Sequence, residues 1–222
     1  MGSDNQFQKK KMRTAQELLR QKAKRSPYES VQIICEGQTE YVYFKFLINF
    51  FRLNTANVSV VTGSGSAPVS IVEEGFDLAK NIPDIDRVVF VFDRDDHESY
   101  ERAINMVNTH RAGSKDKSKP KYEVITSTPC FEIWLLLHFK CTTKAYNKSG
   151  SKTAADILIS DLRQHIASYQ KTNVSHWIEQ LIHRTEAAIK NAQLLQEHNK
   201  KTNSINPSTN VHVLIELFKA LK

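Results

Sequence analysis

Residues 88–96 constrain the fold of this chain more than any other segment. The segment begins with five consecutive β-branched or aromatic residues and ends with Asp93, Asp95 and Asp96. An unbroken apolar run of this length is typical of a strand that is buried on both faces, and therefore of the centre of a parallel sheet. In open parallel sheets, ligands bind outside the carboxyl ends of the strands. The aspartates are therefore candidates for a metal-binding or phosphate-binding site.

Strand and helix patterns alternate along the first part of the chain. The strand patterns are residues 31–35, 58–61, 88–92 and 122–125, and helical patterns follow the first three of them at about 39–51, 68–80 and 97–110. This alternation predicts right-handed crossovers and a parallel sheet with helices on both faces. From residue 127 onward the pattern is helical. Pro129 is expected at the first helical position of an apolar helix, and further helices are expected at about 152–168, 174–199 and 208–221.

We therefore predict an α/β fold with three regions. A basic, flexible arm (1–27) precedes a core (28–126) whose central parallel sheet is flanked by helices, and a helical C-terminal region (127–222) packs on that core. The first 27 residues are too polar for a signal peptide, and no apolar run approaches the roughly 18 residues that span a bilayer. The three cysteines form no Cys-x-x-Cys pair. These features predict a cytoplasmic protein that does not contact a membrane.

The charge of the chain predicts an anionic partner. The formal net charge is +7, and the basic residues concentrate in the arm and in residues 111–121. Nucleic acid is the commonest partner of such proteins. Lysines of this second segment, together with the arginine after the acidic strand, are expected to contact phosphates: Lys115, Lys117, Lys119, Lys121 and Arg94. The arm is equally consistent with a solvated tail.

Acids follow two of the predicted strands. Glu36 and Glu40 come after the first strand, and Asp93 and Asp95 after the third. If these strands are neighbours, the acids converge, and two carboxylates about 4 Å apart would repel by roughly 4 kcal/mol at an effective dielectric near 20. A bound Mg²⁺ or Mn²⁺ reverses the sign of that interaction, and a site with oxygen donors alone favours these hard ions. Such an ion can polarise a phosphodiester.

Each acid also has a structural interpretation. Asp95 or Asp96 could cap the helix that is predicted to follow, and Glu40 lies in a first helical turn, where the helix dipole favours any acid. Glu132 and His138 lie on a largely apolar helix, where most such residues are structural partners. Their roles are left open at this point.

Four blocks of the sequence resemble a known family. The pattern of Glu36-Gly37-x-x-Glu40 after one strand and Asp93-x-Asp95 after another resembles the Toprim fold of type IA topoisomerases, bacterial primases and OLD-type nucleases. More specifically, the chain resembles the RloB-like (AbiL-type) family of bacterial phage-defence proteins. The blocks that carry this resemblance are residues 34–44, 92–95, 129–139 and 206–212.

The resemblance implies an enzyme, a Mg²⁺- or Mn²⁺-dependent nuclease that acts in abortive-infection defence under the control of an ATPase partner. Glu36, Asp93 and Asp95 would hold the metal, and Glu40 would bind a second metal or act as a base. Whether the substrate is DNA or RNA, transfer RNA included, stays open, as does the oligomeric state. The alternative is a non-catalytic nucleic-acid-binding or regulatory subunit, in which the acids are caps and salt bridges.

Overall fold

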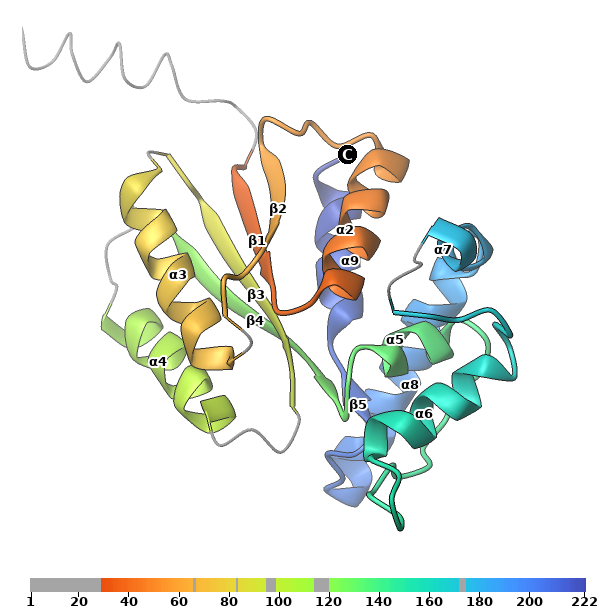
Figure 1. Cartoon of the computed structure of the whole chain (residues 1–222). Helices are drawn as coiled ribbons and strands as arrows, with labels where there is room; N and C mark the ends of the chain where they lie inside the picture. Colours follow the sequence, from red (N-terminus) through yellow and green to blue (C-terminus); the bar gives the residue numbers. More distant parts are fainter. Residues whose placement is uncertain (1–28, 66, 83, 95–98, 114–119, 172–174) are drawn as a thin grey trace, which may run out of the picture.

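A computed structural model describes residues 29–222, except for 66, 83, 95–98, 114–119 and 172–174. The described chain forms a five-stranded sheet with helices on both faces (Figure 1). The strand order is β2-β1-β3-β4-β5. The first four strands are parallel and the last is antiparallel to β4, with these bounds: β1 (Val31–Cys35), β2 (Val58–Thr62), β3 (Arg87–Asp93), β4 (Lys121–Thr128) and β5 (Ser208–Thr209). The predicted α/β fold class is confirmed.

The helices form two layers and a further group (Figure 1). One face of the sheet is covered by α3 (Pro68–Asn81) and α4 (Ser99–Gly113). The other face is covered by α2 (Gln38–Phe51), α5 (Glu132–Leu137) and α9 (Val211–Ala220). The chain between α5 and α9 contains α6 (Ala154–Arg163), α7 (Ser175–Ile182) and α8 (Thr185–Thr202). None of the described helices is long and apolar enough to cross a membrane.

The apolar run of β3 is buried because both faces of this strand are covered. Val89 and Val91 pack in the core beneath α2, α5 and α9. Val88, Phe90 and Phe92 pack in the core beneath α3 and α4. Complete burial of each such side chain contributes roughly 1.5–3 kcal/mol. This accounts for the absence of polar residues between Arg87 and Asp93, the two ends of the strand.

The beginning of α5 corrects one prediction. Pro129 does not occupy the first helical position, because α5 begins at Glu132 and Pro129 lies in the turn after β4. The predicted helix at 174–199 is also wrong in extent. It is divided between α7 and α8, and the Thr185 hydroxyl donates to the Ile182 carbonyl at 2.8 Å where α7 ends.

The final helix begins later than predicted, at Val211 instead of residue 208. Ser208 and Thr209 form β5, where the edge of β4 satisfies their polar groups: the Ser208 hydroxyl donates to Thr128 Oγ1 at 3.1 Å. Asn210 fixes this connection, since its side chain accepts from the Thr126 N–H at 2.6 Å. The exposed edge of the parallel sheet thus takes up residues that the helical pattern assigned to a cap.

Gly75 is required by the packing of α3 on the sheet. An added Cβ at this position would overlap the ring of Phe90 and lie 2.7 Å from Ile34 Cδ1, and both of these side chains are fully buried. A glycine-to-alanine change within a helix usually stabilises it by about 1 kcal/mol. We expect Gly75→Ala instead to destabilise the protein by about 2 kcal/mol, because the added methyl overpacks the core.

Urea denaturation of four proteins tests this prediction: wild type, Gly75→Ala, Phe90→Leu and the double variant. If the overlap with the Phe90 ring is the cause, the double variant will be more stable than the sum of the two single changes predicts. An additive result would show that the ring of Phe90 is not what excludes a side chain at residue 75.

Candidate active site at the carboxyl ends of β1 and β3

Glu36 and Asp93 meet because β1 and β3 are neighbours. The two strands pair in parallel with Cys35 opposite Val91, and the Glu36 N–H continues the ladder by donating to the Val91 carbonyl at 2.9 Å. Glu36 Oε2 accepts a hydrogen bond from the Asp93 N–H at 3.0 Å. The carboxylate of Glu36 is therefore held against the last residue of β3. The predicted convergence of these two strand ends is confirmed.

Glu40 reaches the same place from the first turn of α2. Its carboxyl group is buried and lies over Gly37, where an added Cβ would be 2.6 Å from Glu40 Oε2. Burial raises the pKa of Glu40 to about 7, and the carboxylates of Glu132 and Glu36 add to the shift, whereas the backbone N–H of Glu40 and Lys171 oppose it. An acid that served only to complement the helix dipole would have a lowered pKa. The environment of Glu40 therefore departs from that structural interpretation.

Asp93 interacts with the acids on three other elements. Burial raises the pKa of Asp93 well above its usual range, and the charges of Glu40, Glu132 and Glu36 raise it further. Four carboxyl groups, from β1, α2, β3 and α5, thus influence one another at this edge of the sheet. We refer to Glu36, Glu40, Asp93 and Glu132 as the acid cluster.

Glu132 brings a fixed carboxylate to the cluster. It is 1% exposed; its Oε1 accepts from the Tyr169 hydroxyl at 2.7 Å and pairs with Lys171 Nζ at 3.1 Å. Burial opposes the charge, but Lys171 and several hydrogen bonds outweigh it, so the pKa of Glu132 is lowered. The other oxygen, Oε2, is buried without a hydrogen-bond partner. Glu132 is therefore a structural partner of Tyr169 and Lys171, and its Oε2 is an anionic oxygen without a hydrogen bond.

The donor chemistry of the cluster suits a hard cation. All four side chains offer carboxyl oxygens. Lys171 pairs with Glu132, and its charge also acts on Glu40. Buried like charges are costly unless a counter-charge compensates them, and a bound metal ion supplies such a charge. Within the described part of the chain, however, no three His, Cys, Asp or Glu side chains are placed to hold a metal ion. Asp95 lies outside the described residues.

The predicted phosphate-binding residues do not all lie near the cluster. Arg94 follows Asp93; its guanidinium pairs with Glu101 at 3.1 Å and lies 5.1 Å from the centre of the Tyr100 ring. Lys121 begins β4, six residues before Ser127, the partner of Asp93. At about 3.3 Å per residue, Lys121 lies about 20 Å from Ser127 along β4, at the amino end of the strand. Lys115, Lys117, Lys119 and the arm lie outside the described residues.

Three residues of the site were missed by sequence reasoning. Tyr169 and Lys171 come from a polar segment without periodicity, so no pattern singled them out. Cys130 lies beside Glu132, and burial together with Glu132 and Asp93 raises the pKa of its thiol. Cys130 is therefore a protonated, weakly polar neighbour of the acids and not a thiolate nucleophile.

His138 lies outside the acid cluster, and its hydrogen bonds define its protonation. Nδ1 lies 3.0 Å from the Trp134 carbonyl, which can only accept, so Nδ1 carries the proton. Nε2 then accepts from the Tyr43 hydroxyl at 3.3 Å. His138 thus joins α2 to α5, the two helices that carry Glu40 and Glu132.

Fold and site together define an α/β protein with a carboxyl-lined site at the carboxyl edge of a parallel sheet, where ligands of such sheets bind. The family model for RloB-like proteins matches residues 31–218, a span that contains the whole acid cluster, and the chain therefore belongs to the RloB-like family. This confirms the resemblance to the RloB-like family that the sequence blocks indicated. Comparisons with curated proteins and with solved structures return no match.

Proposed function

We propose that this protein is a metal-dependent nuclease with a Toprim-type active site, which hydrolyses phosphodiester bonds of nucleic acid as an effector of anti-phage defence. The observation that carries the proposal is the convergence of the acid cluster, from four separate elements, at the carboxyl edge of the sheet. Membership of the RloB-like family supports a role in defence. Control by an ATPase partner is part of the proposal, and copurification with such a protein would test it.

The roles of the acids follow from their surroundings. Glu36 and Asp93 would hold a divalent cation, with Asp95 as the further acid that the sequence offers at this edge and Glu132 Oε2 as a buried oxygen in need of a positive partner. When bound, Mg²⁺ or Mn²⁺ would polarise the phosphodiester and make water a better nucleophile. Glu40, whose pKa is about 7, is suited to accept the proton of the attacking water at neutral pH.

A cleavage assay tests the proposal. The full chain is incubated with single-stranded DNA, duplex DNA and total RNA in Mg²⁺, in Mn²⁺ or in EDTA. We expect cleavage of at least one substrate with either ion and none in EDTA. An Asp93→Asn protein, purified in the same way and shown to be folded by circular dichroism, is expected to be inactive. Cleavage in EDTA, or by the folded variant, would contradict the proposal.

The rival function is a non-catalytic subunit whose acids serve only as caps and ion pairs. The ion pair between Glu132 and Lys171 is an observation that favours this rival function. The two functions differ in their response to metal, since a ligand that binds only the folded state raises its stability. A nuclease of the proposed type should melt at a higher temperature in Mg²⁺, and the shift should shrink in Asp93→Asn. Absence of both a shift and cleavage would support the rival.

A further inference from the structure

A groove lies beside Arg94, the residue that directly follows Asp93 of the acid cluster. It consists of two cavities of about 540 and 720 Å³ at the carboxyl end of β4. Both cavities are lined by Arg94, Thr128 and Ile205, so they adjoin along these three residues. We refer to the two cavities together as the β4 groove. The volume of each cavity lies in the range of pockets for small ligands, about 300–1,000 Å³.

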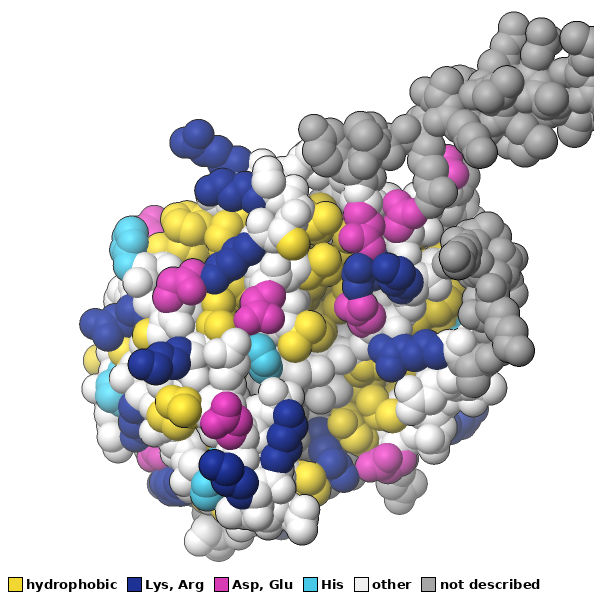
Figure 2. Space-filling view, turned by 180° about the vertical axis from the view of Figure 1, so that it is seen from behind, with side chains coloured by type: hydrophobic (Ala, Val, Ile, Leu, Met, Phe, Trp, Pro, Cys, Tyr) yellow, Lys and Arg dark blue, Asp and Glu magenta, His cyan; other side chains and the backbone are white. Residues whose placement is uncertain are grey.

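The charged side chains that line the β4 groove are all basic, and one of them, Arg94, also pairs with Glu101, which is not among the lining residues. Arg94 and Lys200 line the first cavity, Arg94 and Lys148 line the second, and no Asp or Glu is among the described residues that line either of them. The face of the molecule seen in Figure 2 carries Asp and Glu side chains interspersed with Lys and Arg. A polar groove with cations and without acids is suited to an anionic chain.

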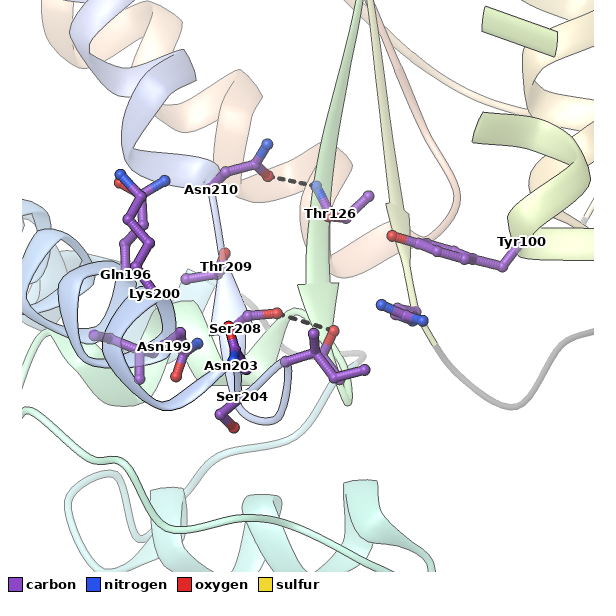
Figure 3. A pocket seen from close by; sticks show the side chains of 14 residues that line it. Tyr100, Thr126, Gln196, Asn199, Lys200, Asn203, Ser204, Ser208, Thr209 and Asn210 are labelled. Atoms are coloured by element: carbon purple, nitrogen blue, oxygen red, sulfur yellow. Dashed lines mark hydrogen bonds between the residues drawn. The ribbon is translucent and has the colours of Figure 1, made fainter. Parts of the chain in front are cut away.

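The walls of the first cavity come from α4 and α8, with β4 and β5 between them (Figure 3). Tyr100 lies on the α4 side, where the Arg94 guanidinium stacks 5.1 Å from its ring centre. Gln196, Asn199 and Lys200 lie on the α8 side (Figure 3). Aromatic rings and guanidinium planes are the surfaces on which unpaired bases stack.

One polar group of the cavity lacks a partner. Asn199 Nδ2 donates to the Pro207 carbonyl at 2.7 Å, which fixes the side-chain amide, and Asn199 Oδ1 is then left buried without a hydrogen bond. A buried acceptor of this kind is stabilised when it receives a hydrogen bond from a donor. The exocyclic amine of a base, or a ribose hydroxyl, is such a donor. At the junction of the two cavities, Ile205 is 55% exposed and offers an apolar surface to a base.

We propose that the β4 groove binds unpaired nucleotides of a nucleic-acid strand next to the point of cleavage. Arg94 directly follows Asp93, and Thr128 is four residues before Glu132, so a strand in the groove leads to the acid cluster. The inference rests on the proposed nuclease function for the identity of its ligand. It adds that the substrate is single-stranded at the site, either as a free strand or as a loop.

Binding of labelled oligonucleotides, measured by fluorescence anisotropy with the full chain in EDTA, tests the groove without cleavage. The probes are a 12-nucleotide RNA, the DNA of the same sequence, and the DNA duplex. Lys200→Glu is compared with Lys201→Glu, which makes the same charge change on the neighbouring exposed residue of α8, outside the groove lining. We expect Lys200→Glu to weaken single-strand binding about tenfold and Lys201→Glu less than about threefold, since only Lys200 would contact a phosphate.

The salt dependence gives a second readout. For a single strand, each phosphate contact contributes about 0.7 to the slope of log affinity against log salt, so Lys200→Glu should lower the slope by roughly that amount. Tighter binding of RNA or of DNA identifies the strand, and either result supports the groove. Equal losses in the two lysine variants, duplex binding as tight as single-strand binding, or no binding of either strand would overturn it.

The failure of this inference is distinguishable from the failure of the proposed function. The binding comparison of Lys200→Glu with Lys201→Glu is made in EDTA and does not require cleavage, and Asp93, whose substitution tests cleavage, does not line the β4 groove. If Lys200 matters for binding but no cleavage occurs with any metal, the groove stands and the nuclease function fails. If cleavage depends on Asp93 but Lys200→Glu binds and cleaves normally, the nuclease function stands and the groove fails.

Discussion

A protein that carries Glu132→Gln is expected to lose as much nucleic-acid cleavage as one that carries Asp93→Asn, a fall of about a thousandfold in rate. This corresponds to roughly 4 kcal/mol of activation free energy. The substituted amide can still accept from the Tyr169 hydroxyl through Oε1, but it no longer forms an ion pair with Lys171, so circular dichroism must show that the variant is folded. What is lost is the negative charge and the unsatisfied oxygen Oε2, which the proposed function assigns to the cation.

Single-turnover cleavage in Mg²⁺ measures this effect, with Tyr169→Phe as the matched control. Tyr169→Phe removes one hydrogen bond to Glu132 Oε1 but leaves the carboxylate and its pairing with Lys171. We expect a loss of only about tenfold, because groups that orient a ligand contribute less than the ligand itself. If Glu132→Gln cleaves like the wild type while Asp93→Asn is inactive, Glu132 is only the structural partner of Lys171.

The part of the site at β1 and β3 could be predicted from the sequence because it depends on local patterns. An apolar run such as residues 88–92 is typical of a strand buried on both faces, and acids that directly follow such a strand lie at the carboxyl edge of the sheet. The strand before Glu36 has the same character. Alternation of strands and helices then required a parallel sheet, in which the carboxyl ends of neighbouring strands are adjacent.

The rest of the site depends on long-range contacts that leave no local pattern. Lys171 is 39 residues beyond Glu132 in the chain, in a polar segment, and its side chain reaches the acid through tertiary packing alone. The separation of Lys121 from Arg94 required the register of β3 on β4. The β4 groove combines α4, β4, β5 and α8, and β5 is a two-residue strand that no periodicity could indicate.

Acidification is expected to remove about 3 kcal/mol of stability through His138. Burial lowers the pKa of this ring to about 4, and the charge of Arg184 adds to the shift. The pKa of His138 in the unfolded chain is about 6.5. Between pH 6.5 and 4, therefore, the unfolded chain binds a proton at this ring and the folded chain does not. The contribution of His138 to the stability of the folded state is therefore fully present above pH 6.5, and it is lost as the pH falls toward 4. Protonation would also remove the acceptor that Nε2 offers to the Tyr43 hydroxyl.

His138→Asn separates this effect from the titration of the carboxyl groups. An Asn amide can still donate to the Trp134 carbonyl, as Nδ1 does, but it does not titrate. Urea denaturation at pH 7.5, 5.5 and 4.5 should show a wild type that is more stable than the variant at pH 7.5, with the difference shrinking by about 2–3 kcal/mol at the lowest pH. A difference that does not change with pH would mean that the folded ring binds a proton as readily as the unfolded one. Because His138 joins α2 to α5, loss of its neutral form would also loosen the spacing between Glu40 and Glu132.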